Sequence, residues 1–426
     1  MLDIRLIAEN PQSIKDNLKK RFQNELLPLV DKLVKDYEVS IKLKKEVEEL
    51  RHRRNIISQE INKLVKEGKP MGVKQKEASE IPEKIKALEE KQAGLEGSCN
   101  TALIKMPNIL HKSVPIGKSE KENKVIKKWG KLPNLKFPIK THVELIEALN
   151  LADFDASAKL AGRGFYLIKD ELALLNQALI RFAIDHMLKK GYSYIETPLM
   201  IKKDLIEAAM DINTFKDSIY KIQDEDLNLI GTSEHSLLGI HKDETIKEED
   251  LPKKYFCYSM CFRKEIGSHG INEKGLWRTH QFNKVEQFIF SNPKDSYKDY
   301  EELLKNTEQL FQKLKLPYRI SEMCSGQLSP WKSKSADLEV YRPTTKAYEE
   351  VASLSNCTDY QARKLKIRIL KKDGSKGIVH TLNNTVVATS RALVAILENY
   401  QQKDGSVKIP AVLQKHMGGL KVITAK

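Results

Sequence analysis

The sequence predicts an α+β protein in which an N-terminal antiparallel coiled-coil hairpin precedes a larger domain that mixes helices and strands. Residues 1–111 carry apolar side chains at helical spacing. Within residues 141–426, helical segments alternate with short strand-like runs. Residues 112–140 are rich in lysine, proline and glycine and show little periodicity, so we predict a linker between the two parts.

Two long amphipathic helices account for most of the first part. No proline or glycine occurs between Pro28 and Gly68, which allows about 60 Å of uninterrupted helix at roughly 1.5 Å per residue. Apolar residues step by three and four along 47–64 and again along 81–102. A glycine- and proline-containing turn separates the two patterns. We therefore expect an antiparallel hairpin over about 28–103.

Composition and charge restrict the class of protein. The 426-residue chain is 40% hydrophobic and 31% charged, as in ordinary globular proteins. We expect neither a membrane span nor a secretory signal, because the sequence has no long apolar run. Five scattered cysteines indicate a reducing compartment, and we expect the cytoplasm. The net charge of +15 suits a polyanionic partner, although a solvated lysine-rich face explains it equally well.

Four separated segments concentrate polar side chains that a hydrophobic core would not need. They read GTSE at 231–234, FRKE to NKVE over 262–286, EEVASLSN at 349–356 and NNTVVATSR at 383–391. Neither a Rossmann nor a P-loop pattern occurs, so an ATP site in this chain would have to bind the nucleotide without either glycine-rich loop. Such a site needs arginines for phosphate oxygens, an aromatic ring for adenine and a carboxylate for Mg²⁺. The candidates are Arg263, Phe282, Glu350 with Ser353, and Arg391.

These segments resemble the motifs of the class II aminoacyl-tRNA synthetases. Residues 191–198 are similar to motif 1, 262–288 to motif 2 and 388–400 to motif 3. The F-R-x-E pattern marks the class, whereas TSE, HQFNKVE and EVASLSN resemble the seryl-tRNA synthetase family. The resemblance implies a mixed, mainly antiparallel sheet flanked by helices. It also implies that the protein activates L-serine with ATP to seryl-adenylate and pyrophosphate, then loads the serine onto the 3′-terminal adenosine of tRNA(Ser).

The resemblance further implies roles for individual residues. Arg263 would grip the α-phosphate and the serine carboxylate, Glu265 would frame the adenine, and Arg391 would bind the γ-phosphate, which makes these three the predicted catalytic residues. The predicted ATP-binding residues are Arg263, Lys264, Glu265, Thr279, His280, Gln281, Phe282, Glu350, Val351, Ala352, Ser353 and Arg391. The predicted serine-binding residues are Thr232, Ser233, Glu234, Arg263, Glu286, Asn383 and Thr385. Glu350 and Ser353 are expected to hold Mg²⁺, and no zinc site is expected.

The family also implies the partners. The hairpin resembles the arm that binds tRNA(Ser) in this family, with tRNA(Sec) as a further candidate. A homodimer is expected, with motif 1 around Pro198 at its interface. Two alternatives stay open, namely a catalytically inactive tRNA-binding paralog and a class II homologue that acylates a carrier protein. The loop from Ser268 to Lys274 lacks the Arg-Asp-Thr-Arg stretch of the family, and 324–337 also departs from its pattern.

Overall fold

The computed structural model describes residues 1–211, 218–266 and 274–425. The chain divides into two compact units, Met1–Pro107 and Asn108–Lys426. Each unit is built around its own apolar contacts, and each is described separately below.

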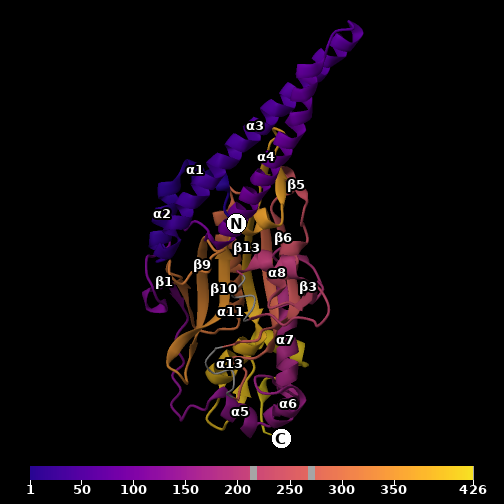
Figure 1. Ribbon diagram of the computed structural model, residues 1–426. Coiled ribbons are helices and arrows are strands. Elements are labelled where there is room, and N and C mark those ends of the chain that lie inside the picture. The colour runs from indigo at the N-terminus through magenta and orange to yellow at the C-terminus, as the bar shows by residue number, and fades with distance from the viewer. Residues whose placement is uncertain (212–217, 267–273, 426) are drawn as a thin grey trace. The chain divides into compact units, whose positions relative to one another are not determined.

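The first unit is helical. After α1 (Ile4–Glu9) and α2 (Pro11–Lys20) come the two long helices α3 (Leu27–Lys66) and α4 (Gly72–Lys105). Figure 1 shows α3 and α4 running alongside each other, and their seam buries Val47, Ile57, Ile81 and Ile85. Ion pairs also join the two helices, such as Arg53 with Glu77 at 2.8 Å. The predicted antiparallel helical hairpin is therefore confirmed, and its two helices span Leu27–Lys66 and Gly72–Lys105.

The second unit is organised on one eight-stranded sheet in the order β1-β8-β9-β10-β13-β7-β6-β2. The pairs are antiparallel except β2 with β6, which is parallel. The sheet is thus mixed and mainly antiparallel, as predicted. In sheet order the strands are β1 (Lys124–Trp129), β8 (Tyr318–Glu322), β9 (Lys334–Arg342), β10 (Ala347–Asn356), β13 (His380–Ala388), β7 (Gln281–Ser291), β6 (Lys253–Phe262) and β2 (Ser193–Tyr194).

Helices pack with this sheet to form the main core (Figure 1). The largest cluster joins α7 (Asp170–Leu188), α11 (Ser296–Lys313) and α13 (Thr389–Tyr400) to the central strands. The structure describes further α-helices in this unit: α5 (His142–Ala148), α6 (Phe154–Ala161), α8 (Lys203–Ala209), α10 (Ser233–Gly239), α12 (Tyr360–Lys364) and α14 (Ala411–Gln414). Within the described residues, three smaller sheets accompany the main one. The first has the order β12-β11-β5, with β12 (Lys376–Ile378), β11 (Arg368–Leu370) and β5 (Thr245–Lys247). The other two are the pairs β14 (Val407–Lys408) with β15 (Val422–Ile423) and β3 (Met200–Lys202) with β4 (Leu227–Leu229).

The segment 112–140, which the sequence predicts to be a linker, instead contributes a strand. β1 lies within it and pairs with β8 at the edge of the eight-stranded sheet. Trp129 stacks on Tyr318 with the ring centres 5.6 Å apart. The strand is mostly exposed and carries lysines on both faces, so its sequence lacks the alternation of polar and apolar residues that would reveal a half-buried strand.

Two β-bulges interrupt the central strands. In β10 the register shifts between Glu350 and Ala352, and in β13 it shifts between Thr385 and Val387. A bulge adds one residue to one strand, so the side chains beyond it change face. Both bulges occur where the strands meet the cavity described next.

Candidate active site

One cavity of about 410 Å³ in the second unit collects most of the predicted site residues. The predicted residues that line it are Thr232, Glu234, Arg263, Glu265, Thr279, Phe282, Glu286, Glu350, Val351, Ala352, Ser353, Asn383, Thr385 and Arg391. They come from β7, β10 and β13, from the starts of α10 and α13, and from the segments that follow β6 and precede β7. Residues far apart in the chain therefore meet at one face of the sheet.

Two arginines mark one part of the cavity. Arg263, directly after β6, donates from Nε to the Gly231 carbonyl oxygen at 3.0 Å, and its guanidinium carbon lies 5.3 Å from the centre of the Phe282 ring. Arg391, in the first turn of α13, donates from Nη1 to the Glu350 carbonyl oxygen at 2.8 Å. Fixed guanidinium groups of this kind suit phosphate oxygens, and the Phe282 ring offers a surface for a base.

Glu350 and Ser353 lie beside Arg391. In a regular strand, residues three apart point to opposite faces; the bulge in β10 adds a residue between them, and both line the cavity. The Glu350 carboxylate is 3.3 Å from Arg391 and is 46% exposed to the open cavity. Desolvation by the surrounding protein opposes ionisation of Glu350, but Arg391 outweighs it and lowers the pKa of the carboxyl.

Asp337 of β9 stands opposite Ser353 in the sheet register. Its Oδ1 atom is buried and has no hydrogen-bond partner among the described residues. Burial, followed by the nearby Glu350 carboxylate, raises the pKa of Asp337 to about 7. Asp337 therefore adds a buried carboxyl group next to the cavity residues Glu350 and Ser353.

A second group of side chains is built on β7 and β13. Glu286 and Lys284 form a buried ion pair, with Nζ 2.5 Å from Oε2. Lys284 also donates to the Thr232 hydroxyl at 2.5 Å, and the Thr385 hydroxyl donates to Glu286 at 3.2 Å. The spacing of two residues puts Lys284 and Glu286 on one face of β7. Together they make a small, highly polar recess.

Glu234 completes this recess. It accepts a hydrogen bond from Gln361 Nε2 at 2.9 Å, and Gln361 in turn accepts from the Thr381 hydroxyl at 2.7 Å. Burial and then the Glu286 carboxylate raise the pKa of Glu234. A recess with two carboxylates and one lysine can accept an ammonium group without leaving an excess of positive charge.

Four predicted site residues do not line the cavity. They are Ser233, Lys264, His280 and Gln281. His280 donates from Nδ1 to the Arg263 carbonyl oxygen at 3.0 Å, and its own carbonyl oxygen accepts from the Arg263 backbone N–H at 2.8 Å. His280 therefore fixes the backbone of Arg263. Ser233 is fully buried at the start of α10, and Gln281 contacts Met260.

Sequence reasoning missed several residues of the cavity wall. They include Lys284, His235, Trp277 and Lys332. The sequence did hold an indication for Lys284, because it stands two residues before Glu286 in β7 and its side chain therefore leaves the same face of the strand. His235 is buried, and burial followed by the charge of Lys284 lowers its pKa to about 3, so it is neutral. The divergent loop positions 268–273 lie outside the described residues, as does any contact that they make.

The described residues also bear on two broader properties. No helix among them is both long and apolar enough to span a bilayer. Within the same residues, no group of three or more His, Cys, Asp or Glu side chains is arranged to hold a metal ion.

Comparison with known proteins places the chain in a family. Residues 1–110 match the model of the seryl-tRNA synthetase N-terminal domain, and residues 217–400 match the class II tRNA synthetase core domain of the G, H, P, S and T enzymes. The serine–tRNA ligase of Methanoregula boonei is 45% identical over 98% of this chain and 99% of its own length. That of Pyrococcus horikoshii is 42% identical over 99% and 98%.

Comparison with solved structures leads to the same family. The crystal structure of seryl-tRNA synthetase from Pyrococcus horikoshii complexed with ATP superposes with a TM-score of 0.96 at 42% identity, covering 100% of both chains. The cytoplasmic serine–tRNA ligase of Naegleria fowleri in complex with AMP gives 0.90 at 34% identity, covering 100% of this chain and 99% of its own. On the motifs, the cavity and these full-length similarities, the chain belongs to the seryl-tRNA synthetase family.

Proposed function

We propose that this chain activates L-serine with ATP, forming seryl-adenylate and pyrophosphate, and then transfers the serine to the 3′-terminal adenosine of tRNA(Ser). One observation carries the proposal: a single cavity joins Arg263 and Arg391 to the recess of Thr232, Glu286 and Thr385. The arginines suit a nucleoside triphosphate, and the recess suits a small amino acid with a hydroxyl group.

The first step needs positioning more than a reactive side chain. The serine carboxylate oxygen attacks the α-phosphorus, the bond from that phosphorus to the bridging oxygen breaks, and pyrophosphate leaves with the electron pair. Arg263 neutralises the α-phosphate and the incoming carboxylate, and Arg391 binds the γ-phosphate. Phe282 packs on the adenine, framed by Glu265 and the 279–282 segment. Fixed cations of this kind stabilise charge that develops in the transition state.

Mg²⁺ fits the side chains beside Arg391. Glu350 and Ser353 face the cavity together, and the lowered pKa of Glu350 keeps it a carboxylate. The Oδ1 atom of Asp337, which has no hydrogen-bond partner among the described residues, is a further buried oxygen; Asp337 stands opposite Ser353 in the sheet register. Hard oxygen ligands of this type are those that Mg²⁺ prefers. Glu350 and Ser353 would hold the ion, which when bound shields the phosphates from one another.

Serine selection rests on the recess. The ammonium group of serine is placed against Thr232 and Glu234, and its hydroxyl against Glu286 and Thr385. Buried polar groups that lose their partner disfavour a substrate without the hydroxyl, which discriminates against alanine. The close walls of the recess discriminate against threonine, whose extra methyl group must find space.

The remaining features extend the proposal to partners and place of action. The hairpin of α3 and α4 binds tRNA(Ser), with tRNA(Sec) as a second candidate. Two copies form a homodimer through the motif 1 region around Pro198, and the protein acts in the cytoplasm. The hairpin counts against a carrier-protein acyltransferase, because such homologues lack the long arm. Retention of Arg263, Glu350 and Arg391 counts against an inactive paralog.

Amino-acid-dependent exchange of pyrophosphate into ATP tests the first step directly. We expect exchange with serine and much weaker exchange with alanine, glycine and threonine. Absence of exchange with every amino acid would exclude a synthetase.

A second experiment tests the arm. Deletion of residues 30–100 should spare serine-dependent exchange and abolish charging of tRNA(Ser), because the cavity lies wholly within the second unit. Charging that survives the deletion would show that the hairpin does not anchor tRNA.

A further inference from the structure

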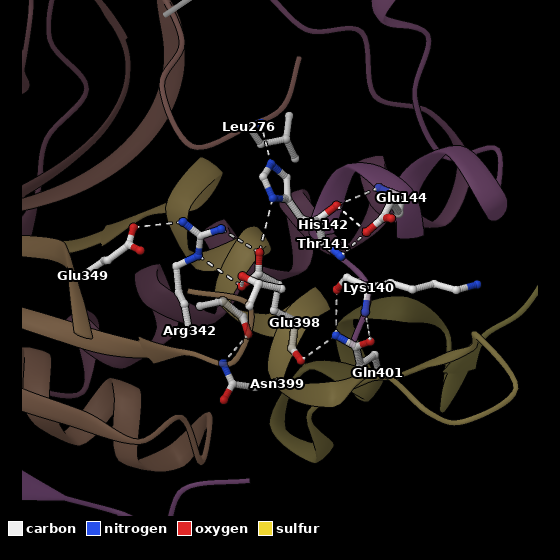
Figure 2. A network of polar contacts seen from close by, with 12 residues as sticks. Lys140, Thr141, His142, Glu144, Leu276, Arg342, Glu349, Glu398, Asn399 and Gln401 are labelled. Atoms are coloured by element: carbon white, nitrogen blue, oxygen red, sulfur yellow. Dashed lines mark hydrogen bonds and ion pairs between the residues drawn. The ribbon is translucent and has the colours of Figure 1, made fainter. Parts of the chain in front are cut away.

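A buried charged cluster surrounds Glu398 of α13 (Figure 2). The fully buried Glu398 carboxylate accepts from His142 Nδ1 at 3.3 Å, from Arg342 Nη2 at 2.7 Å and from the Thr344 hydroxyl at 2.6 Å. Burial opposes its ionisation, yet His142 and Arg342 hold the pKa of Glu398 at about 2. Glu398 lies seven residues after Arg391, so both side chains leave the same face of the helix two turns apart.

His142 connects this cluster to the segment that follows residue 273. The Leu276 backbone N–H donates to His142 Nε2 at 3.2 Å, as Figure 2 shows. Since Nε2 accepts, the ring proton is on Nδ1 and points to Glu398. A Cβ at Gly275, whose φ is +140°, would lie only 2.5 Å from Nε2. The backbone at Gly275 and Leu276 therefore packs directly against the imidazole ring of His142.

The next residue, Trp277, lines the cavity. The guanidinium carbon of Arg342 lies 4.4 Å from the centre of a Trp277 ring, and that of Arg391 lies 5.4 Å from it. Arg342 also donates to Glu349 at 2.9 Å, and Glu349 adjoins Glu350, the partner of Arg391. Two routes thus run from the buried cluster to Arg391, one through the indole ring and one through β10.

We propose that His142, Arg342 and Glu398 form a positioning device that fixes Trp277 and thereby orients Arg391 at the phosphate part of the cavity. The inference rests on the proposed function, in which Arg391 binds the γ-phosphate. An arginine that is already held in place loses less conformational freedom when its ligand binds. His142, Arg342, Glu398 and Trp277 are positioning residues in this scheme and do not touch the reacting atoms.

Two substitutions of His142 separate its two hydrogen bonds. In His142→Asn the amide stands near the position of Nδ1, so the donor to Glu398 is kept and the acceptor for Leu276 is lost. In His142→Gln the amide oxygen reaches the position of Nε2 and keeps that acceptor. We expect His142→Asn to raise the KM for ATP about tenfold and to leave the KM for serine within about twofold. His142→Gln, which keeps the contact with Leu276 but loses the donor to Glu398, should raise the KM for ATP less than His142→Asn does.

The Kd for ATP, measured by calorimetry, should follow the same order and needs no catalysis. Equal effects of the two variants, or parallel increases in the KM values of ATP and serine, would overturn the positioning role. A wild-type protein that binds ATP but shows no exchange with any amino acid refutes the proposed function instead. The calorimetric comparison of His142→Asn with His142→Gln then still decides the inference.

A double-mutant cycle tests the route through the indole ring. Trp277→Leu removes the ring that lies between the buried cluster and Arg391, whereas Trp277→Phe keeps an aromatic surface. If His142 acts through Trp277, the double variant His142→Asn/Trp277→Leu should bind ATP as weakly as Trp277→Leu alone. Additive losses in ATP affinity would show that the two residues act independently, which contradicts the proposal.

Discussion

Lys284 and Glu286 stand two residues apart on β7 and form an ion pair of 2.5 Å that is almost wholly buried in the wall of the cavity. Lys284 is at the same time the hydrogen-bond donor to Thr232. A single lysine therefore links two of the predicted serine-binding residues and balances one of the two carboxylates of the recess.

Replacing Lys284 with methionine should damage both serine binding and folding. The change leaves Glu286 buried without its cation, which destabilises proteins by about 3–5 kcal/mol. We expect the KM for serine in the exchange assay to rise more than tenfold, and urea unfolding to show the loss of stability. Adding Glu286→Gln should recover much of the stability and none of the serine affinity. An unchanged KM for serine would contradict this role.

Thr385→Val should weaken the discrimination of serine from alanine. Valine has nearly the shape of threonine but cannot donate to Glu286, as Thr385 does at 3.2 Å. We expect the ratio of kcat/KM for serine over alanine to fall by about 10- to 100-fold. Thr389→Val is the matched control, because the buried Thr389 hydroxyl has no hydrogen-bond partner among the described residues. A comparable fall in the control would assign the effect to packing.

Arg263→Lys should reduce the rate of exchange by about 100-fold at saturating ATP and serine. Lysine keeps the positive charge but loses the planar fork that can bond a phosphate and a carboxylate together. It also loses the bond from Nε to the Gly231 carbonyl oxygen. Arg319→Lys, in an ion pair with Glu339 on the sheet, is the control and should retain activity. Equal activity of the Arg263 variant would remove this residue from the mechanism.

Stability should fall as the pH decreases below about 6.5. Burial lowers the pKa of His186 and of His380 to about 4 each, so both are neutral in the folded protein at pH values where the unfolded chain takes up protons. Their stabilising contribution is present above the unfolded value near 6.5 and is lost as the pH falls toward 4. For His186 the loss amounts to about 3 kcal/mol over this window.

His186→Gln tests this dependence. Glutamine can still donate to the Asn306 carbonyl oxygen, which His186 contacts at 2.9 Å, but it does not titrate. The free energy of unfolding, measured in urea at pH 7, 6 and 5, should depend less on pH in the variant than in the wild type. Identical slopes would mean that the pKa of His186 is the same in the folded and unfolded states.

Periodic features of the structure could be predicted from the sequence. The hairpin was predictable because its apolar spacing continues over many turns, and α7 and α11 because each has one apolar face. β1 was not, because an edge strand with lysines on both faces has no alternation to detect. The polar segments of the cavity were predictable from their motifs, since four clusters of polar residues stand out from the surrounding sequence.

The contacts between those segments were not predictable in the same way. Lys284 in the recess and the link from His142 to Leu276, 134 residues apart, depend on which side chains the fold brings together. Neither has a repeating pattern. The contact made by the His280 side chain was not predictable either. The motif around His280 suggested a contact with ATP, whereas in the structure its side chain donates a hydrogen bond to the carbonyl oxygen of Arg263.

The bulge in β10 makes the site sensitive to the number of residues as well as to their identity. Glu350 and Ser353 share the cavity because one additional residue separates them in the strand. Removing Val351 would keep every polar group of the segment and remove the bulge, so Glu350 and Ser353 would stand two residues apart and still share one face of the strand. A one-residue deletion in the regular part of β10 would instead turn the side chains beyond it to the opposite face, so it should be more harmful than the removal of Val351 and than most single substitutions.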